Sequence, residues 1–262
     1  MNEDLTDWTE RLEAAIEAEG ISSFDRVFVL SACESTQDAA KRLCASKPGA
    51  VVVAGRQTAG RGRLGRPWVQ KGGLGIAVTF VLPHDRLDAG TLSIAAGVAA
   101  VEAAGSLLDQ AQGPRVGLRW PNDLVERGRG RKVAGILVER SESLMLVGVG
   151  MNVLHRESDW GEDLGGRACS LAELGATATR LEVVRRLMCA LEGALALKPE
   201  ALAEAWGHHD TLLGKRAEFA YNGSRYQGVV DAISPTHEIV IRTPSGDPQR
   251  LPCMQTSLVR WE

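Results

Sequence analysis

The hydrophobic pattern of the chain changes once, close to Gly214. Before that point, short β-branched runs such as Ala50–Ala54 alternate with longer stretches of helical spacing, such as Thr91–Leu108. After it, short strand-like runs follow one another and are separated by Gly and Pro. The change predicts two units: a larger domain of helices and strands over residues 1–213, and a β-barrel of about five strands over residues 214–262.

Periodicity and turn residues place the individual elements. In the larger unit we expect strands at 27–30, 50–54, 75–82, 116–120, 133–139 and 144–153. Helices are expected at 5–19, 91–108, 181–197 and 201–213, and a further helix begins with Ser35 or Thr36 as its N-cap. In the smaller unit we expect strands at 215–221, 225–232, 238–242 and 256–261.

Positive charge is concentrated in one segment, Gly55–Trp68, which interleaves four arginines with four glycines. The chain as a whole has a net charge of −3, yet no acidic residue lies between Asp38 and Asp85. Glycine lets a backbone approach a ligand, and the guanidinium fork matches carboxylate and phosphate oxygens. We interpret this arginine–glycine loop as a flap over a small anionic ligand. The alternatives are a solvated basic loop and a nonspecific grip on nucleic-acid phosphates.

Composition excludes several classes of function. A sequence pI near 6.0 argues against general nucleic-acid binding. The five cysteines form no CxxC pair, so neither a disulfide framework nor a zinc ribbon is indicated, and His and carboxylates lack metal-ligand spacing. We find no signal peptide and no stretch of membrane-spanning length. We therefore expect a cytoplasmic protein.

The hexapeptide Arg119-Trp-Pro-Asn-Asp-Leu124 follows a predicted strand. Pro121 fixes the turn, so Asn122 and Asp123 are held at the strand end. Asn and Asp in a turn are most often turn formers. The functional alternative is that the carboxylate holds Mg²⁺ beside phosphates or orients a nearby cation.

Lys132 opens a strand that is otherwise apolar. In the alternation of a strand, Lys132 shares a face with Ala134, Ile136 and Val138. A lysine on an apolar face is costly unless it pairs with an anion. Lys132 is therefore expected either to extend to solvent at the strand end or to point at a carboxylate or phosphate.

The strand Val147-Gly-Val-Gly-Met-Asn152 contains two glycines and ends on a polar side chain. Glycine inside a buried strand indicates close approach of a ligand or of another chain segment. Packing alone also explains the glycines, so this motif by itself does not indicate a site.

Taken together, the ordered motifs resemble biotin–protein ligase, also called biotin–[acetyl-CoA-carboxylase] ligase, over nearly the whole chain from Val27 onward. The segments that carry the resemblance are Glu34–Gln37, Gly60–Trp68, Trp120–Leu124, Lys132–Glu139 and Gly148–Asn152. The resemblance implies an α+β fold: a mixed sheet with flanking helices, like the core of class II aminoacyl-tRNA synthetases, followed by an SH3-like barrel.

The resemblance also implies the chemistry. Biotin and MgATP would give biotinyl-5′-AMP, and the biotinyl group would pass to a lysine of biotin carboxyl carrier protein. Too few residues precede Val27 for the DNA-binding domain of bifunctional relatives, so we expect a monofunctional enzyme without repressor function. The expected partners are biotin, ATP and the carrier protein, with no DNA and no membrane, for a monomer or a homodimer.

The family motifs assign site residues position by position. The catalytic residues would be Lys132 and Arg63. The residues that the resemblance assigns to biotin are Ser35, Thr36, Gln57, Gly60, Arg61, Arg63, Trp68, Lys132, Gly135 and Gly148. Those assigned to ATP or the adenylate are Arg63, Arg66, Arg119, Asn122, Asp123 and Asn152, and Asp123 is the expected Mg²⁺ ligand.

This chain departs from the family pattern in Glu34-Ser-Thr-Gln37, where Asp-Ser-Thr-Asn is commoner, in Arg119, where lysine is usual, and in Gly75, where a larger residue is often found. Three other functions remain open: a lipoate–protein ligase or octanoyltransferase of the same fold, a nucleic-acid-binding module, and a sensor that binds biotinyl-AMP without turnover. An affinity for nucleic acid that falls steeply with salt and needs no ATP would indicate the nucleic-acid-binding module.

Overall fold

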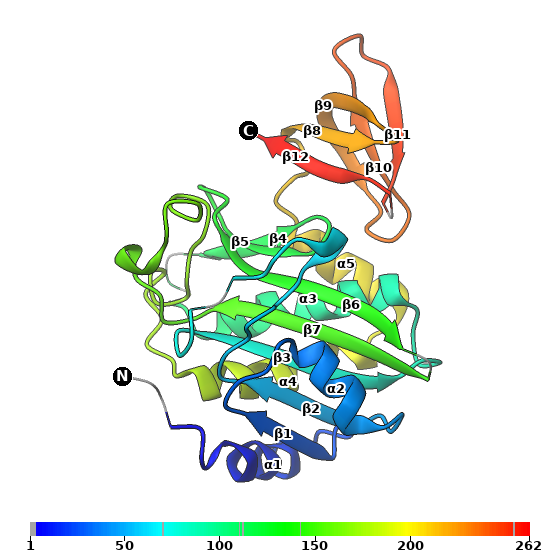
Figure 1. The fold of residues 1–262 in the computed structure, drawn as a ribbon. Coiled ribbons are helices and arrows are strands. Elements are labelled where there is room, and N and C mark those ends of the chain that lie inside the picture. Colours follow the sequence, from blue (N-terminus) through cyan, green and yellow to red (C-terminus); the bar gives the residue numbers. More distant parts are fainter. Residues whose placement is uncertain (1–3, 70, 110, 112, 142, 254) are drawn as a thin grey trace.

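The computed structural model describes residues 4–262, with the exception of 70, 110, 112, 142 and 254. Two sheets dominate it (Figure 1). The larger sheet contains, in spatial order, β1 (Arg26–Leu30), β2 (Ala50–Ala54), β3 (Gly75–Pro83), β7 (Leu144–Asn152), β6 (Lys132–Ser141), β5 (Asp123–Glu126) and β4 (Val116–Arg119). β1 and β2 are parallel and every other neighbouring pair is antiparallel, so the sheet is mixed, as expected.

Alternation along β2 supplies both faces of this sheet. Val51 and Val53 join the main core, whereas Ala50 and Val52 join a second core on the opposite face. Behind the main core lie α1 (Trp8–Ala18), α3 (Ala89–Ser106), α4 (Arg180–Ala196) and α5 (Pro199–His209). The opposite face carries α2 (Thr36–Cys44), which lies over β2, β3 and β7 (Figure 1). The rest of that face is available for a site.

Helix α3 is mostly apolar because it is a core helix. By length and composition alone it could cross a membrane, but 61% of its 18-residue window is buried inside the protein. It packs against α4, α5 and the strands of the larger sheet. Its N-cap is Asp88, whose carboxylate accepts from the backbone N–H groups of Gly90 and Thr91.

The smaller sheet follows α5 and is entirely antiparallel. In spatial order it contains β11 (Pro248–Pro252), β10 (Glu238–Arg242), β9 (Ser224–Ile233), β8 (Arg216–Tyr221) and β12 (Ser257–Trp261). β11 and β12 form its two edges and do not pair with each other in the described residues, so the sheet is open and an SH3-like barrel stays a prediction. Phe219 and Leu251 belong to the same core cluster as the larger sheet, so the two sheets pack together.

Candidate active site

A cavity of about 300 Å³ opens on the face of the larger sheet beside α2. The arginine–glycine loop and strand β12 of the smaller sheet also contribute to its wall. The residues that were predicted for the site and line this cavity are Ser35, Thr36, Gln57, Arg61, Arg63, Arg66, Trp68, Arg119, Asn122, Asp123, Lys132, Gly135 and Gly148. Gly60 and Asn152, which were also predicted, are not part of the lining. The structure therefore brings together segments from residue 35 to residue 261 of the sequence.

On the α2 side, the cavity is lined by hydroxyl and amide groups. Of the two predicted N-caps of α2, Ser35 is the one found, and its hydroxyl accepts from the backbone N–H of Gln37. Gln57 Oε1 accepts from the backbone N–H of Thr36 at 2.7 Å and from the Thr36 hydroxyl at 3.1 Å. Because both contacts use the amide oxygen, the Nε2 donor is the part of Gln57 that stays available. Gly60 fits this arrangement, since a Cβ there would lie 2.8 Å from Gln57 Nε2.

Glycines in β6 and β7 make room for side chains that reach over the sheet. A Cβ on Gly148 would lie 2.7 Å from the amide of Gln37, and a Cβ on Gly150 would lie 2.5 Å from the ring of Trp68. Trp68 thus packs flat on β7, where only glycine leaves space. Sequence reasoning assigned Gly148 to ligand contact and did not assign Gly150 or Gln37. In the structure Gly148 and Gly150 make room for packed side chains, and a ligand would lie beside the same glycines.

Three charged side chains form a chain along the cavity. Asp123 Oδ1 lies 2.6 Å from Lys132 Nζ, and Asp123 Oδ2 accepts from Arg119 Nη2 at 2.8 Å. Arg119 is almost fully buried and also donates to the carbonyl of Gly130. Asp123 therefore aligns one cation from β4 and one from β6 at the same wall.

The predicted face of Lys132 is wrong. A β-bulge shifts the pairing of β6 with β5, so Leu124 opposes Ala134 but Val125 opposes Lys132. A Cβ on Gly135 would lie 3.1 Å from Lys132 Nζ, which places the lysine on the cavity face with Gly135. Ala134 and Ile136 point to the other face and are buried in the main core. The extra residue of the bulge breaks the period of two on which the prediction rested.

Both oxygens of Asp123 contact a cation, Oδ1 that of Lys132 and Oδ2 that of Arg119. A metal bound to this carboxylate would share it with these two cations. No group of three or more His, Cys, Asp or Glu side chains that could hold a metal occurs in the described part of the chain. The geometry therefore fits the alternative that Asp123 orients nearby cations.

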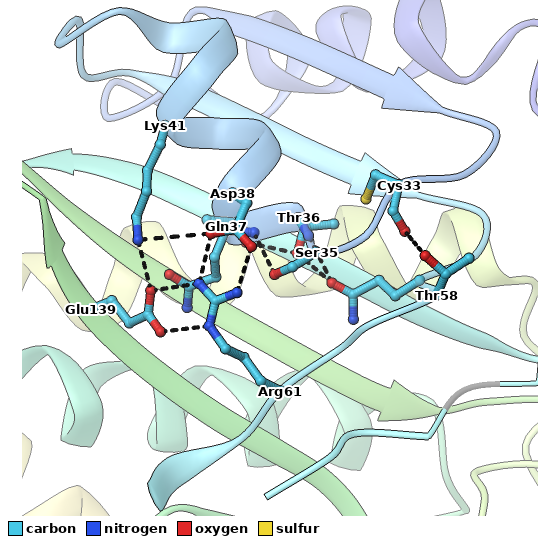
Figure 2. A network of polar contacts seen from close by, with 11 residues as sticks. Cys33, Ser35, Thr36, Gln37, Asp38, Lys41, Thr58, Arg61 and Glu139 are labelled. Carbon is cyan, nitrogen blue, oxygen red and sulfur yellow. Dashed lines mark hydrogen bonds and ion pairs between the residues drawn. The ribbon is translucent and has the colours of Figure 1, made fainter. Parts of the chain in front are cut away.

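The arginines of the arginine–glycine loop have different environments. Arg61 donates four hydrogen bonds to two carboxylates, those of Asp38 and Glu139 (Figure 2). Arg63 pairs with no carboxylate among the described residues, and burial lowers the pKa of its guanidinium while nearby Asp123 raises it. Arg66 is exposed at the cavity rim. Arg63 is thus a partly buried loop cation that no carboxylate of the described residues neutralises.

Both predicted asparagines have backbone partners. Asn122 Nδ2 donates to the carbonyl of Ile136 at 2.6 Å, which ties the turn before β5 to β6. Asn152 Nδ2 donates to the carbonyls of Lys132 and Cys169 and is buried behind the cavity. Asn152 therefore supports the start of β6, where Lys132 lies, and Asn122 combines this structural role with a place in the lining.

The smaller sheet supplies cavity residues that sequence reasoning did not assign. The guanidinium carbon of Arg119 lies 3.9 Å from the ring centroid of Trp261, in a cation–π contact. Thr256, Leu258 and Val259 also line the cavity. Trp261 could have been noticed as a large aromatic residue on an exposed strand, but nothing in the sequence connects it to Arg119.

Comparisons with known proteins show which proteins the chain resembles. Residues 29–153 match the Biotin/lipoate A/B protein ligase family. The biotin–[acetyl-CoA-carboxylase] ligase of Mycobacterium tuberculosis is 36% identical over 148 residues, which are 55% of this chain and 53% of that protein. The bifunctional ligase/repressor BirA of Bacillus subtilis is 32% identical over 168 residues, 60% of this chain and 50% of that protein. The chain is thus similar to biotin ligases over rather more than half of its length.

Solved biotin protein ligases share the fold over most of their length. The enzyme from Aquifex aeolicus in complex with biotin and ATP superposes with a TM-score of 0.78 at 28% identity, covering 90% of this chain and all of that one. The Leishmania major enzyme has a TM-score of 0.59 at 22% identity, and this likeness supports a common fold only. The chain spans about half the length of the curated relatives of the family that it matches.

Proposed function

We propose that this chain is an ATP-dependent biotin–protein ligase, which forms biotinyl-5′-AMP and transfers the biotinyl group to a lysine of biotin carboxyl carrier protein. One observation carries the proposal: a single cavity joins an amide-and-hydroxyl end to a cationic wall. The cavity lining contains no histidine and no cysteine among the described residues. The site is thus suited to bringing two anions together.

The amide-and-hydroxyl end suits the ureido head group of biotin. The ureido carbonyl needs donors, and Gln57 Nε2 is available because its Oε1 is occupied by Thr36. The Thr36 hydroxyl accepts from Thr79 Oγ1 at 2.9 Å and donates to Gln57, so it is held in one orientation. Trp68 adds an apolar wall above β7 for the ring and the valeryl chain.

The cationic wall suits the reacting groups. In the first step, a carboxylate oxygen of biotin attacks the α-phosphorus of ATP; a phosphorus–oxygen bond forms there, and the bond to pyrophosphate breaks. Negative charge accumulates on the phosphoryl oxygens in the transition state. Lys132, Arg63 and Arg119 carry three positive charges against the one negative charge of Asp123. A preorganised donor at such a position is worth roughly 10²–10³ in rate.

Lys132 has the leading catalytic role in this proposal. Its ammonium group points into the cavity, contacts Asp123 and lies 5.4 Å from the ring centroid of Trp68. Asp123 holds the ammonium group in place without neutralising the wall. Arg63 contributes a second charge from the opposite side, on the arginine–glycine loop.

In the second step, the amine of a carrier lysine attacks the acyl carbon of the adenylate, AMP leaves, and the amine loses a proton. Residues 1–213 would form the catalytic domain and residues 214–262 an SH3-like domain that closes the nucleotide side through β12. We place the reaction in the cytoplasm, with no DNA or membrane partner, in a monomer or a homodimer. Mg²⁺ would enter with the phosphates of ATP, since both oxygens of Asp123 already contact a cation.

Transfer to a carrier protein tests the proposal. The purified chain is incubated with MgATP, a biotin carboxyl carrier domain and biotin, and the carrier is weighed by mass spectrometry. We expect one biotinyl group on the carrier lysine, and no product when lipoate or octanoate replaces biotin. A lipoyl or octanoyl adduct would favour the rival ligase of the same fold, and no adduct from a folded chain would contradict the proposal.

A further inference from the structure

Arg61 lies in the arginine–glycine loop and donates four of its five N–H groups to carboxylates. Its Nη1 and Nη2 donate to the two oxygens of Asp38 at 2.6 and 2.9 Å. Its Nε and Nη2 donate to the two oxygens of Glu139 at 2.9 Å each. Two paired contacts of this kind are strong and directional. Little donor capacity is left for a ligand.

The two carboxylates come from different elements. Asp38 is on α2 and Glu139 is on β6, so Arg61 joins the loop to both at once (Figure 2). Lys41 of α2 completes the group, 3.1 Å from Glu139 and 3.9 Å from Asp38. Two positive and two negative charges balance. We call these four residues the loop anchor: Asp38, Lys41, Arg61 and Glu139.

Residues 60–68 of the loop form a short hairpin above the anchor. The Trp68 backbone N–H donates to the carbonyl of Gly60 at 2.8 Å, and that of Gly62 donates to Arg66 at 2.7 Å. The tip turns through Leu64 and Gly65, both with positive φ, and the Leu64 side chain is 75% exposed. The tip has no apolar packing to hold it. The position of the hairpin therefore depends on its base.

We propose that Asp38 and Glu139 are positioning residues, which act through Arg61 to hold the hairpin over the cavity before ligand binds. This inference rests on the proposed function only in naming the ligand as biotin and its adenylate. The anchored hairpin places Arg63 and Trp68 against the cavity. Without the anchor, part of the binding free energy would go into ordering the hairpin. The apparent affinity would then fall in proportion to the fraction of molecules whose hairpin is closed.

This role predicts a distinct pattern of effects. Loss of the anchor raises KM for biotin, because fewer free molecules are closed, and changes kcat little, because the closed complex keeps Lys132 and Arg63. The contacts are about one-third exposed, so salt weakens them. The hairpin then opens more often even with no ligand present. Arg63–Leu64, at the tip, is a trypsin site in this segment.

The test uses the full chain with Glu139→Gln, Asp38→Asn and both changes together. Limited trypsin digestion without ligand is followed by mass spectrometry of the fragments that end at Arg61 and Arg63. Cleavage elsewhere and thermal unfolding report on global stability. The matched control is Glu182→Gln, which removes contacts with Arg185 and Arg186 on α4, away from the cavity. KM and kcat for biotin are measured on the same proteins.

We expect the double variant to be cut at Arg61 and Arg63 at least fivefold faster than wild type and Glu182→Gln, with other sites unchanged. Its KM for biotin should rise at least fivefold, with kcat within twofold. Unchanged cleavage at both positions, or cleavage raised equally throughout the chain, would overturn the inference. The digestion needs no substrate, so a wild-type protein inactive with biotin would refute the proposed function while the loop anchor was still tested.

Discussion

Lys132 Nζ and Asp123 Oδ1 lie 2.6 Å apart, on neighbouring antiparallel strands and across a β-bulge. The bulge brings the lysine onto the cavity face, and the carboxylate fixes where the ammonium group lies. Asp123 also holds Arg119, so a single negative charge organises two positive ones. This arrangement explains how a mildly acidic protein presents a cationic wall to its cavity.

Removal of the ammonium group should stop the first step. We expect Lys132→Ala to fold and to lose adenylate formation by roughly 10²–10³-fold, because the charge contacts the reacting groups. The measurement is single-turnover formation of biotinyl-AMP. Lys71→Ala is the matched control, since Lys71 pairs with Asp159 outside the cavity. Near-normal turnover in Lys132→Ala would remove Lys132 from the mechanism.

Asp123 should matter through its two cations and not as a metal ligand. Asp123→Asn leaves Lys132 and Arg119 without their shared carboxylate, and we expect adenylation to fall roughly 10- to 100-fold. The apparent affinity for Mg²⁺, measured by titration at saturating ATP, should stay within about twofold. A large increase in the Mg²⁺ requirement would show that the carboxylate binds the metal.

Arg63 and Arg66 of the loop should differ in how much they contribute to adenylation. Arg63→Gln should lower kcat for adenylation by roughly 10²-fold, because Arg63 keeps its charge for the transition state. Arg66→Gln, at an exposed position, should cost less than about tenfold. Steady-state pyrophosphate exchange distinguishes them, and equal losses in the two variants would contradict this division.

Trp261 links the smaller sheet to the charged chain. Its ring covers Arg119, and a cation–π contact is worth about 0.5–2 kcal/mol. Trp261→Ala should raise KM for ATP by roughly 3- to 30-fold, whereas Trp261→Phe should retain part of the contact. An alanine variant with unchanged KM for ATP would show that β12 only borders the cavity.

His155 should make the protein less stable in mild acid. Its ring stacks on Trp160, with centroids 4.4 Å apart, and burial lowers its pKa to about 4 from an ordinary value of 6.5, although nearby Asp159 raises it. Between these two pH values the unfolded chain binds the proton and the folded protein does not. Stability therefore falls as pH falls from about 6.5 to about 4, by up to about 3 kcal/mol.

Urea unfolding of wild type and His155→Phe at pH 7 and at pH 4.5 measures this effect. The phenylalanine ring keeps the stack but does not titrate, so its loss of stability between the two pH values should be smaller. Equal losses in both proteins would mean that other groups cause the acid sensitivity.

Local sequence patterns predicted most elements because the signals are local. The buried strand Ala50–Ala54 and the strand Glu238–Arg242 were predicted as the structure has them, and Ser35 is one of the two N-caps that were predicted. Two strands were missed. β5 begins at Asp123, which was interpreted as part of a turn, and β11 begins and ends with proline.

What the sequence could not predict depends on pairing between distant segments. The bulge in β6 places Lys132 on the opposite face of the strand from the one predicted, and no residue in that strand indicates a bulge. Arg61 was assigned to biotin from its motif, but its partners Asp38 and Glu139 lie 23 and 78 residues away. Trp261 meets Arg119 only because the two sheets pack together.

The most direct test of the central claim is exchange of labelled pyrophosphate into ATP by the purified chain, with and without biotin. The account predicts exchange that requires biotin and Mg²⁺, is not supported by lipoate or octanoate, and is lost in Lys132→Ala. Exchange without biotin, or no exchange by a folded protein in the presence of biotin, would contradict it.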